Sequence, residues 1–124
     1  MALSVTPLAG QLGAFEIYQS STPGVPNNNV TSGAAGALQV VEINNSANVT
    51  NVYVKLYDNA GPTIGTTGPN WIFFVPRGLK RTFTCPGGSA FTNLSFACLT
   101  LAGTAGTAAN ANPPRPVSVR LVVT

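Results

Sequence analysis

Short runs of alternating apolar and polar residues, separated by stretches rich in Gly, Pro and Asn, follow one another along the whole chain. The clearest run is NVYVKLYDN, where Val52, Val54 and Leu56 alternate with larger polar or amphipathic residues. A period of two residues is typical of a β-strand with one face in the core. No stretch sustains the 3.6-residue period of an amphipathic helix. The pattern predicts strands at 14–20, 37–46, 51–59, 71–76, 81–85, 91–103 and 117–124.

Strands of this number and spacing, with turn signals between them, predict an all-β fold. We expect one antiparallel β-sandwich, jelly-roll-like, of about seven to eight short strands with long arm-like loops, covering residues 14–124. Residues 1–13 lack a clear period and are expected to form an extended N-terminal arm or a short edge strand. The sequence PGGS at 86–89 predicts a tight turn between two strands.

Two connections, 21–36 and 103–116, are longer than ordinary hairpin loops. They contain few large apolar side chains, so they bury little surface on one domain. Their backbone donors and acceptors still need partners. We therefore expect these segments, together with residues 1–13, to lie along neighbouring subunits; the alternative is that they are mobile loops.

The composition adds one expectation, which concerns association with other subunits. Apolar residues make up 44% of the 124 residues and charged residues only 7%, against roughly a quarter in a typical soluble domain. No apolar run approaches the roughly 20 residues of a membrane helix. Protein interfaces are depleted of charge, so the composition favours a homo-oligomer. A neutral β domain with a surface of hydroxyls and amides is the alternative.

The chain carries few residues that perform chemistry. It has no histidine, and its three acidic residues lie far apart in the sequence. We therefore expect no catalytic, cofactor-binding or metal site, and we expect that the protein is not an enzyme. The formal net charge is +3, and only Arg77, Lys80 and Arg81 cluster. No aromatic residues interleave with a longer basic run, so nucleic-acid binding is not expected.

Tyr53, Lys55 and Tyr57 share the face of their strand opposite its apolar set. They are either an exposed strand face with long amphipathic side chains or a contact surface for a partner, because Tyr is enriched at interfaces. Trp71 is expected in the core, with sugar stacking as the alternative.

Cys85 and Cys98 fall on the apolar faces of two strands that we expect to be neighbours. The N-terminus has no basic segment followed by an apolar one, so no signal peptide is expected and synthesis in a reducing cytosol is favoured. Two buried, reduced thiols are therefore the favoured state, and a disulfide is the alternative.

The middle of the chain reads NVYVKLYDNAGPTIGTTGPNWIFFVPRG and continues through FTCPGGSAFTNLSFACLTLAGTA. Over roughly residues 50–107 it resembles small virion structural proteins of tailed bacteriophages. The resemblance implies a capsid decoration (cement) protein, made in the bacterial cytoplasm, that binds the major capsid protein as a symmetric oligomer, with a trimer favoured. A tail, neck or baseplate component of the virion is one alternative, and a carbohydrate- or ligand-binding β-sandwich module is another. The resemblance implies no active-site residue.

Overall fold

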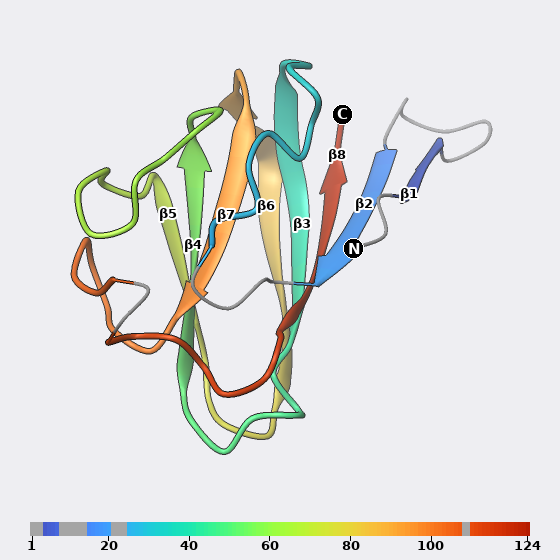
Figure 1. Cartoon of the computed structure of the whole chain (residues 1–124). Coiled ribbons are helices and arrows are strands. Elements are labelled where there is room, and N and C mark those ends of the chain that lie inside the picture. The colour runs from blue at the N-terminus through green and yellow to red at the C-terminus, as the bar shows by residue number, and fades with distance from the viewer. Residues whose placement is uncertain (1–3, 8–14, 21–24, 108–109) are drawn as a thin grey trace.

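Antiparallel strands account for all the regular structure in the computed structural model (Figure 1), which describes residues 4–7, 15–20, 25–107 and 110–124. No described residue is helical. The strands are β1 (Ser4–Pro7), β2 (Phe15–Ser20), β3 (Gly36–Asn44), β4 (Val52–Asp58), β5 (Trp71–Val75), β6 (Lys80–Phe91), β7 (Leu94–Leu99) and β8 (Ser118–Val123).

Two sheets contain these strands. The order in the first is β1-β2-β8-β3-β6, and the order in the second is β5-β4-β7. Every pair of neighbouring strands in the described residues is antiparallel, which confirms the expected all-β, antiparallel class. Six strands, β3 to β8, have their side chains described throughout, and they form two antiparallel three-stranded sheets. These six strands are fewer than the seven to eight that the sequence predicted.

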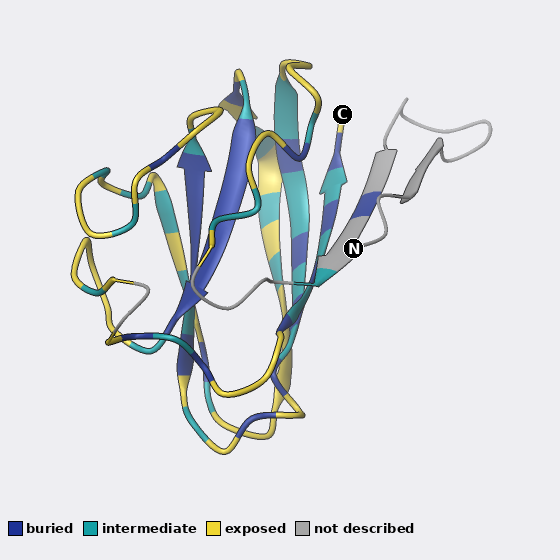
Figure 2. Ribbon diagram, in the orientation of Figure 1, coloured by how far each residue is buried: buried dark blue, intermediate teal, exposed yellow. Residues whose placement is uncertain are grey.

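The apolar faces of both sheets supply one hydrophobic core (Figure 2). The alternating set predicted on β4 is fully buried, and so are the inward residues of β8. Burying one such aliphatic side chain stabilises the folded state by about 1.5–3 kcal/mol. The core therefore holds the sheets together through the residues whose two-residue period is visible in the sequence: Val52, Val54, Leu56, Val117, Val119, Leu121 and Val123.

The tight turn predicted at 86–89 is instead an irregularity within β6. Residues 85–88 bulge out of the pairing with β3, because Thr84 pairs with Val40 and Ser89 pairs with Leu38. Gly87 has φ +80° and lies in the left-handed region that glycine adopts without strain. Pairing resumes after the bulge, so β6 is longer than the predicted strand 81–85. The following strand, β7, is shorter than the predicted 91–103.

The long connections pack on their own domain. The backbone of Asn27 exchanges hydrogen bonds of 2.8 and 3.0 Å with that of Phe96, and Val30 N–H donates to Leu94 O at 2.7 Å. This segment therefore covers the outer edge of β7. After β7, Thr100 N–H donates to the carbonyl of Ala111 at 2.7 Å. These described backbone groups thus find partners within the chain, and contact of the long connections with neighbouring subunits stays a prediction.

Part of the expected N-terminal arm belongs to a sheet. Ser4–Pro7 forms β1, which pairs with β2 from Ser4 opposite Tyr18 to Pro7 opposite Phe15. It is thus a short edge strand, the second of the two expected forms. Residues 1–3 and 8–13 of the expected arm lie outside the described residues.

A buried amide, Asn45, joins the turns at one end of the molecule. Its side chain is fully buried, and its Nδ2 lies 3.0, 3.3 and 3.2 Å from the carbonyl oxygens of Thr50, Val75 and Pro76. Its backbone N–H donates to Leu79 O at 2.9 Å. One side chain therefore ties the β3–β4 connection to the β5–β6 connection.

Asn48 continues this network. Its Nδ2 donates to Asn45 Oδ1 at 2.9 Å and to the carbonyl of Arg115 at 3.0 Å, while Arg115 N–H donates to Asn48 Oδ1 at 2.8 Å. The carbonyl of Asn48 accepts from Gly78 N–H at 3.0 Å. We call Asn45 and Asn48 the asparagine hub; it fixes three connections at the same end of the core.

Asn45→Ala removes the donor that these buried carbonyls share. We expect it to lower the free energy of unfolding by about 2–4 kcal/mol, because buried polar groups left without a partner are costly. Urea denaturation measures the change. Asn28→Ala, at an exposed position, is the matched control and should change stability by less than about 0.5 kcal/mol. Equal effects of the two substitutions would show that the hub does not stabilise the fold.

The two cysteines lie in different sheets, Cys85 in β6 and Cys98 in β7, which corrects the expected neighbouring strands. Both are thiols in the structure; Cys98 is buried and Cys85 is half-buried. Titration of freshly purified protein under denaturing, non-reducing conditions should therefore count two thiols. In the native state, Cys85 should be alkylated first, because its sulfur is the more accessible. A count of zero would demonstrate a disulfide.

Candidate interaction surfaces

The outward face of β4 is not the exposed stripe that the sequence suggested. Lys55 is fully buried and Tyr57 is 1% exposed, while Tyr53 is half-buried. The connection after β7 lies over this face, and Lys55 Nζ donates to the carbonyl of Ala105 at 2.8 Å. The expectation of exposure is therefore wrong for Lys55 and Tyr57, which are both buried. A distant segment of the chain contacts Lys55.

Burial perturbs both covered groups. The cross-strand neighbours of Lys55, which are Ile72 and Ala97, are apolar, and no ion pair to Lys55 occurs among the described residues. Burial lowers the pKa of Lys55 below its ordinary value. Burial likewise raises the pKa of Tyr57. The ammonium group is thus used to hold a connection onto the sheet.

Apolar surface remains open beside this covered face. Tyr53 packs against Phe74 with ring centroids 5.1 Å apart. Phe74 is 38% exposed, and Ile72 on the same face of β5 is 43% exposed. We call Tyr53, Ile72 and Phe74 the outer patch. Its residues adjoin the edge of the second sheet, so a partner can approach them from the side as well as from above.

A second apolar surface lies where β5 and β6 form the edges of the two sheets. Phe73 and Phe83 pack together across the sheets with ring centroids 4.9 Å apart. Trp71, Phe73, Phe83 and Cys85 are only partly buried, although they pack against the core. We call these four residues the seam. Trp71 therefore contacts the core as expected, but it also remains accessible.

Cations gather at one end of the seam. Arg77 lies in the turn between β5 and β6, and Lys80 and Arg81 begin β6; all three are exposed. Lys80 forms an ion pair with Glu42, with Nζ 3.4 Å from Oε1. Neither Arg77 nor Arg81 has an ion pair among the residues that the structure describes. We call Arg77, Lys80 and Arg81 the basic end.

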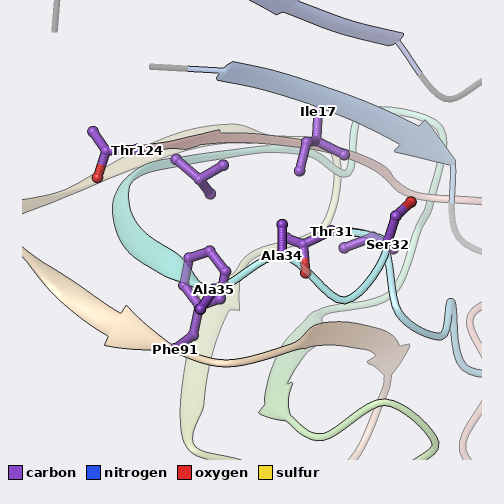
Figure 3. Close-up of a pocket in the computed structure, with 9 residues that line it drawn as sticks. Ile17, Thr31, Ser32, Ala34, Ala35, Phe91 and Thr124 are labelled. Carbon is purple, nitrogen blue, oxygen red and sulfur yellow. The ribbon is translucent and has the colours of Figure 1, made fainter. Parts of the chain in front are cut away.

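An apolar cavity of about 290 Å³ opens at the other side of the molecule (Figure 3). Ile17 of β2 approaches it from one side, and Phe91 and Ala35 approach it from the other. Its polar side chains are hydroxyls, which at neutral pH neither accept a proton nor carry charge. The cavity can therefore hold an apolar side chain or a small apolar ligand, and the side chains that line it offer no acid or base. Its lining is Ile17, Val30, Thr31, Ser32, Ala34, Ala35, Phe91, Val123 and Thr124.

Groups able to perform chemistry do not converge in the described part of the chain. It contains no cluster of three or more His, Cys, Asp or Glu residues that could hold a metal ion. Asp58 Oδ1 accepts the backbone N–H groups of Thr92 and Asn93 at 2.8 and 2.9 Å, so this carboxylate fixes a turn. No helix among these residues is long and apolar enough to cross a membrane.

The asparagine hub and the seam were not anticipated from the sequence. The Asn-rich run NNSANVTN at 44–51 signals a turn, but nothing in it marks Asn45 and Asn48 as buried. The seam joins residues of two sheets, so no local pattern contains it.

Neither a protein-family model, nor a curated protein, nor a solved structure matches the chain. The two surfaces, the basic end and the cavity therefore supply the structural basis for a functional proposal.

Lys55→Met should change how stability depends on pH. The pKa of Lys55 is lowered in the folded state, so between that lowered value and 10.5 the unfolded chain binds more protons and stability rises with pH. In the methionine variant, no ammonium group has to be buried, so the cost of burying that charge is absent. We expect its free energy of unfolding at neutral pH to match or exceed the wild-type value, and its increase as the pH rises towards 10.5 to be smaller.

Urea unfolding at several pH values checks this expectation. Burial raises the pKa of Tyr57 in the folded state of both proteins, so the contribution of Tyr57 cancels from the difference between their pH profiles. Parallel pH profiles for the two proteins would show that Lys55 titrates as it does in the unfolded chain.

Proposed function

We propose that this chain is a structural protein of a phage virion, and specifically a capsid decoration (cement) protein that binds and stabilises the head shell as a symmetric oligomer. The observation that carries the proposal is the outer patch, an exposed aromatic and aliphatic surface on an edge strand. The resemblance of residues 50–107 to small virion proteins supports the placement on a phage particle. The partner would be the major capsid protein, and the oligomer a trimer.

The small number of charged residues supports a role in assembly. Only 7% of the residues are charged, and one of the lysines is buried against a carbonyl instead of facing solvent. Association through the outer patch would remove apolar area from water at little electrostatic cost. A trimer held together through the outer patch would tolerate wide changes of salt.

The two sheets and their shared core support a jelly-roll-like β-sandwich as the finer description of the fold. In that arrangement, β5 and the outer patch stand at one edge. A neighbouring subunit could lie on the outer face of the second sheet there and cover Ile72 and Phe74.

Two other roles use the same features. A tail, neck or baseplate component of the virion would need the outer patch in the same way. A ligand-binding β-sandwich module is favoured by the cavity of about 290 Å³, whose size falls at the small end of ligand pockets. A monomer that binds a small apolar ligand would favour this second role.

The oligomeric state tests the structural proposal. Light scattering at micromolar concentration should give the mass of a trimer, and that mass should persist at near-molar salt, because apolar contacts are not screened. Phe74→Ser should shift the protein towards the monomer. Val49→Ser, at another exposed apolar position, is the control and should leave the oligomer intact. A wild-type monomer would contradict the proposal.

Protein identification on purified virions tests the location. Particles released from a host that carries this gene should contain the chain, in a number of copies that follows the symmetry of the shell. Its absence from intact particles would contradict a virion role, whatever its oligomeric state.

A further inference from the structure

The edges of β5 and β6 have room for another strand. In the described part of the chain, β5 pairs only with β4, and β6 pairs only with β3. The bulge at 85–88 interrupts β6, so 80–84 is its regular edge. A five-residue edge is about 17 Å long at about 3.3 Å per residue. Each edge therefore suits an extended segment of five or six residues.

The seam supplies apolar contacts at these edges. Its aromatic side chains point from the two sheets into the space between them, and they remain partly accessible because no described strand lies beyond β5 or β6. A strand added at either edge turns alternate side chains to this same side. Its apolar residues would complete the burial of Trp71 and Phe73.

The basic end adds a requirement of charge. Alternation along β6 places Arg81 on the same face as Phe83. Arg81 pairs with Ile43, which is buried in the core, so this is the face of β6 that is turned towards the core. Arg77 stands in the adjoining turn. Two exposed guanidinium groups, neither of which forms an ion pair with a described residue, thus border one end of the seam. They would favour a segment that brings carboxylates to that end.

A second copy of this chain does not offer such carboxylates among its described side chains. Glu42 is engaged by Lys80, and Asp58 accepts two backbone N–H groups. Nucleic acid matches the charge, but its phosphates do not supply the alternating donors and acceptors that a strand edge pairs with. The occupant that satisfies edge, seam and charge together is an extended segment of a different polypeptide.

We propose that the seam, the two strand edges and the basic end form a docking site for an extended, apolar segment of a partner protein with acidic residues at one end. The inference rests on the proposed function only in supposing a polypeptide partner. Recognition combines main-chain pairing with apolar burial and charge-assisted hydrogen bonds. It would define the surface through which this chain attaches to its neighbour.

The experiment uses the full-length protein and a synthetic probe. The probe is a capped peptide of alternating valine and threonine that ends in two aspartates, and its control has lysines in place of the aspartates. Trp71 is the only tryptophan of the chain and lies in the seam, so its fluorescence reports binding. We expect a saturable change with the acidic peptide, weakening as salt is raised, and slower alkylation of Cys85. The lysine peptide should bind at least about tenfold more weakly.

Two double variants separate local charge from net charge. Arg77→Ser with Arg81→Ser removes the guanidinium groups, whereas Asn28→Glu with Ala60→Glu adds acids at exposed positions outside the basic end. Each pair lowers the formal net charge from +3 to +1. We expect about tenfold weaker binding of the acidic peptide for the first pair and less than about twofold for the second.

Several results would overturn the inference. These are no response of Trp71 or Cys85 to the acidic peptide, equal binding of the two peptides, equal effects of the two double variants, or tighter binding of a single-stranded oligonucleotide. Failure here is distinguishable from failure of the proposed function, because the trimer depends on Phe74 and resists salt. A salt-resistant trimer that ignores the peptide would leave the structural role standing and place its attachment surface elsewhere.

Discussion

The asparagine hub is the constraint on which the arrangement of the surfaces depends. Asn45 and Asn48 are buried where water cannot satisfy the turn backbone, and their amides bond to three connections that are distant in sequence. Buried polar groups are expensive unless they are paired, so this network specifies one arrangement of the turns. The turn that carries Arg77 is one of the three, and the position of the basic end follows from the hub.

Packing on one side of the molecule leaves the other side open. The segment around Asn27 covers the edge of β7, and the segment around Ala105 covers the outward face of β4. Nothing comparable covers β5 and β6 within the described residues. Edges of this kind are commonly blunted by bulges and cations, and β6 has both. Its bulge limits the edge to 80–84, while Arg81 selects against a basic partner. The bulge and the cation that hinder non-specific pairing at the β6 edge can thus also favour a specific partner.

Lys55 shows how this chain uses a rare charge. Its position in NVYVKLYDN is typical of a solvent-facing strand residue, and the alternation of its strand was correctly predicted. Its burial depends on a carbonyl fifty residues away in sequence. No local pattern contains such a contact, so the sequence predicted the correct face and the wrong exposure. Tyr57 is likewise buried, although the alternation of its strand predicts that it faces outwards.

Alternation by itself determined the all-β class, the antiparallel pairing and the buried sets of β4 and β8, because a two-residue period is a property of the local backbone. Composition by itself determined that this chain supplies no histidine side chain to any site. Tertiary structure alone decided that PGGS is a bulge within β6, that the long connections fold back, and that Cys85 and Cys98 belong to different sheets. It also decided where the seam opens. These features arise from contacts between segments distant in the chain, where one backbone group finds its partner or fails to find one, and a linear pattern does not record that outcome.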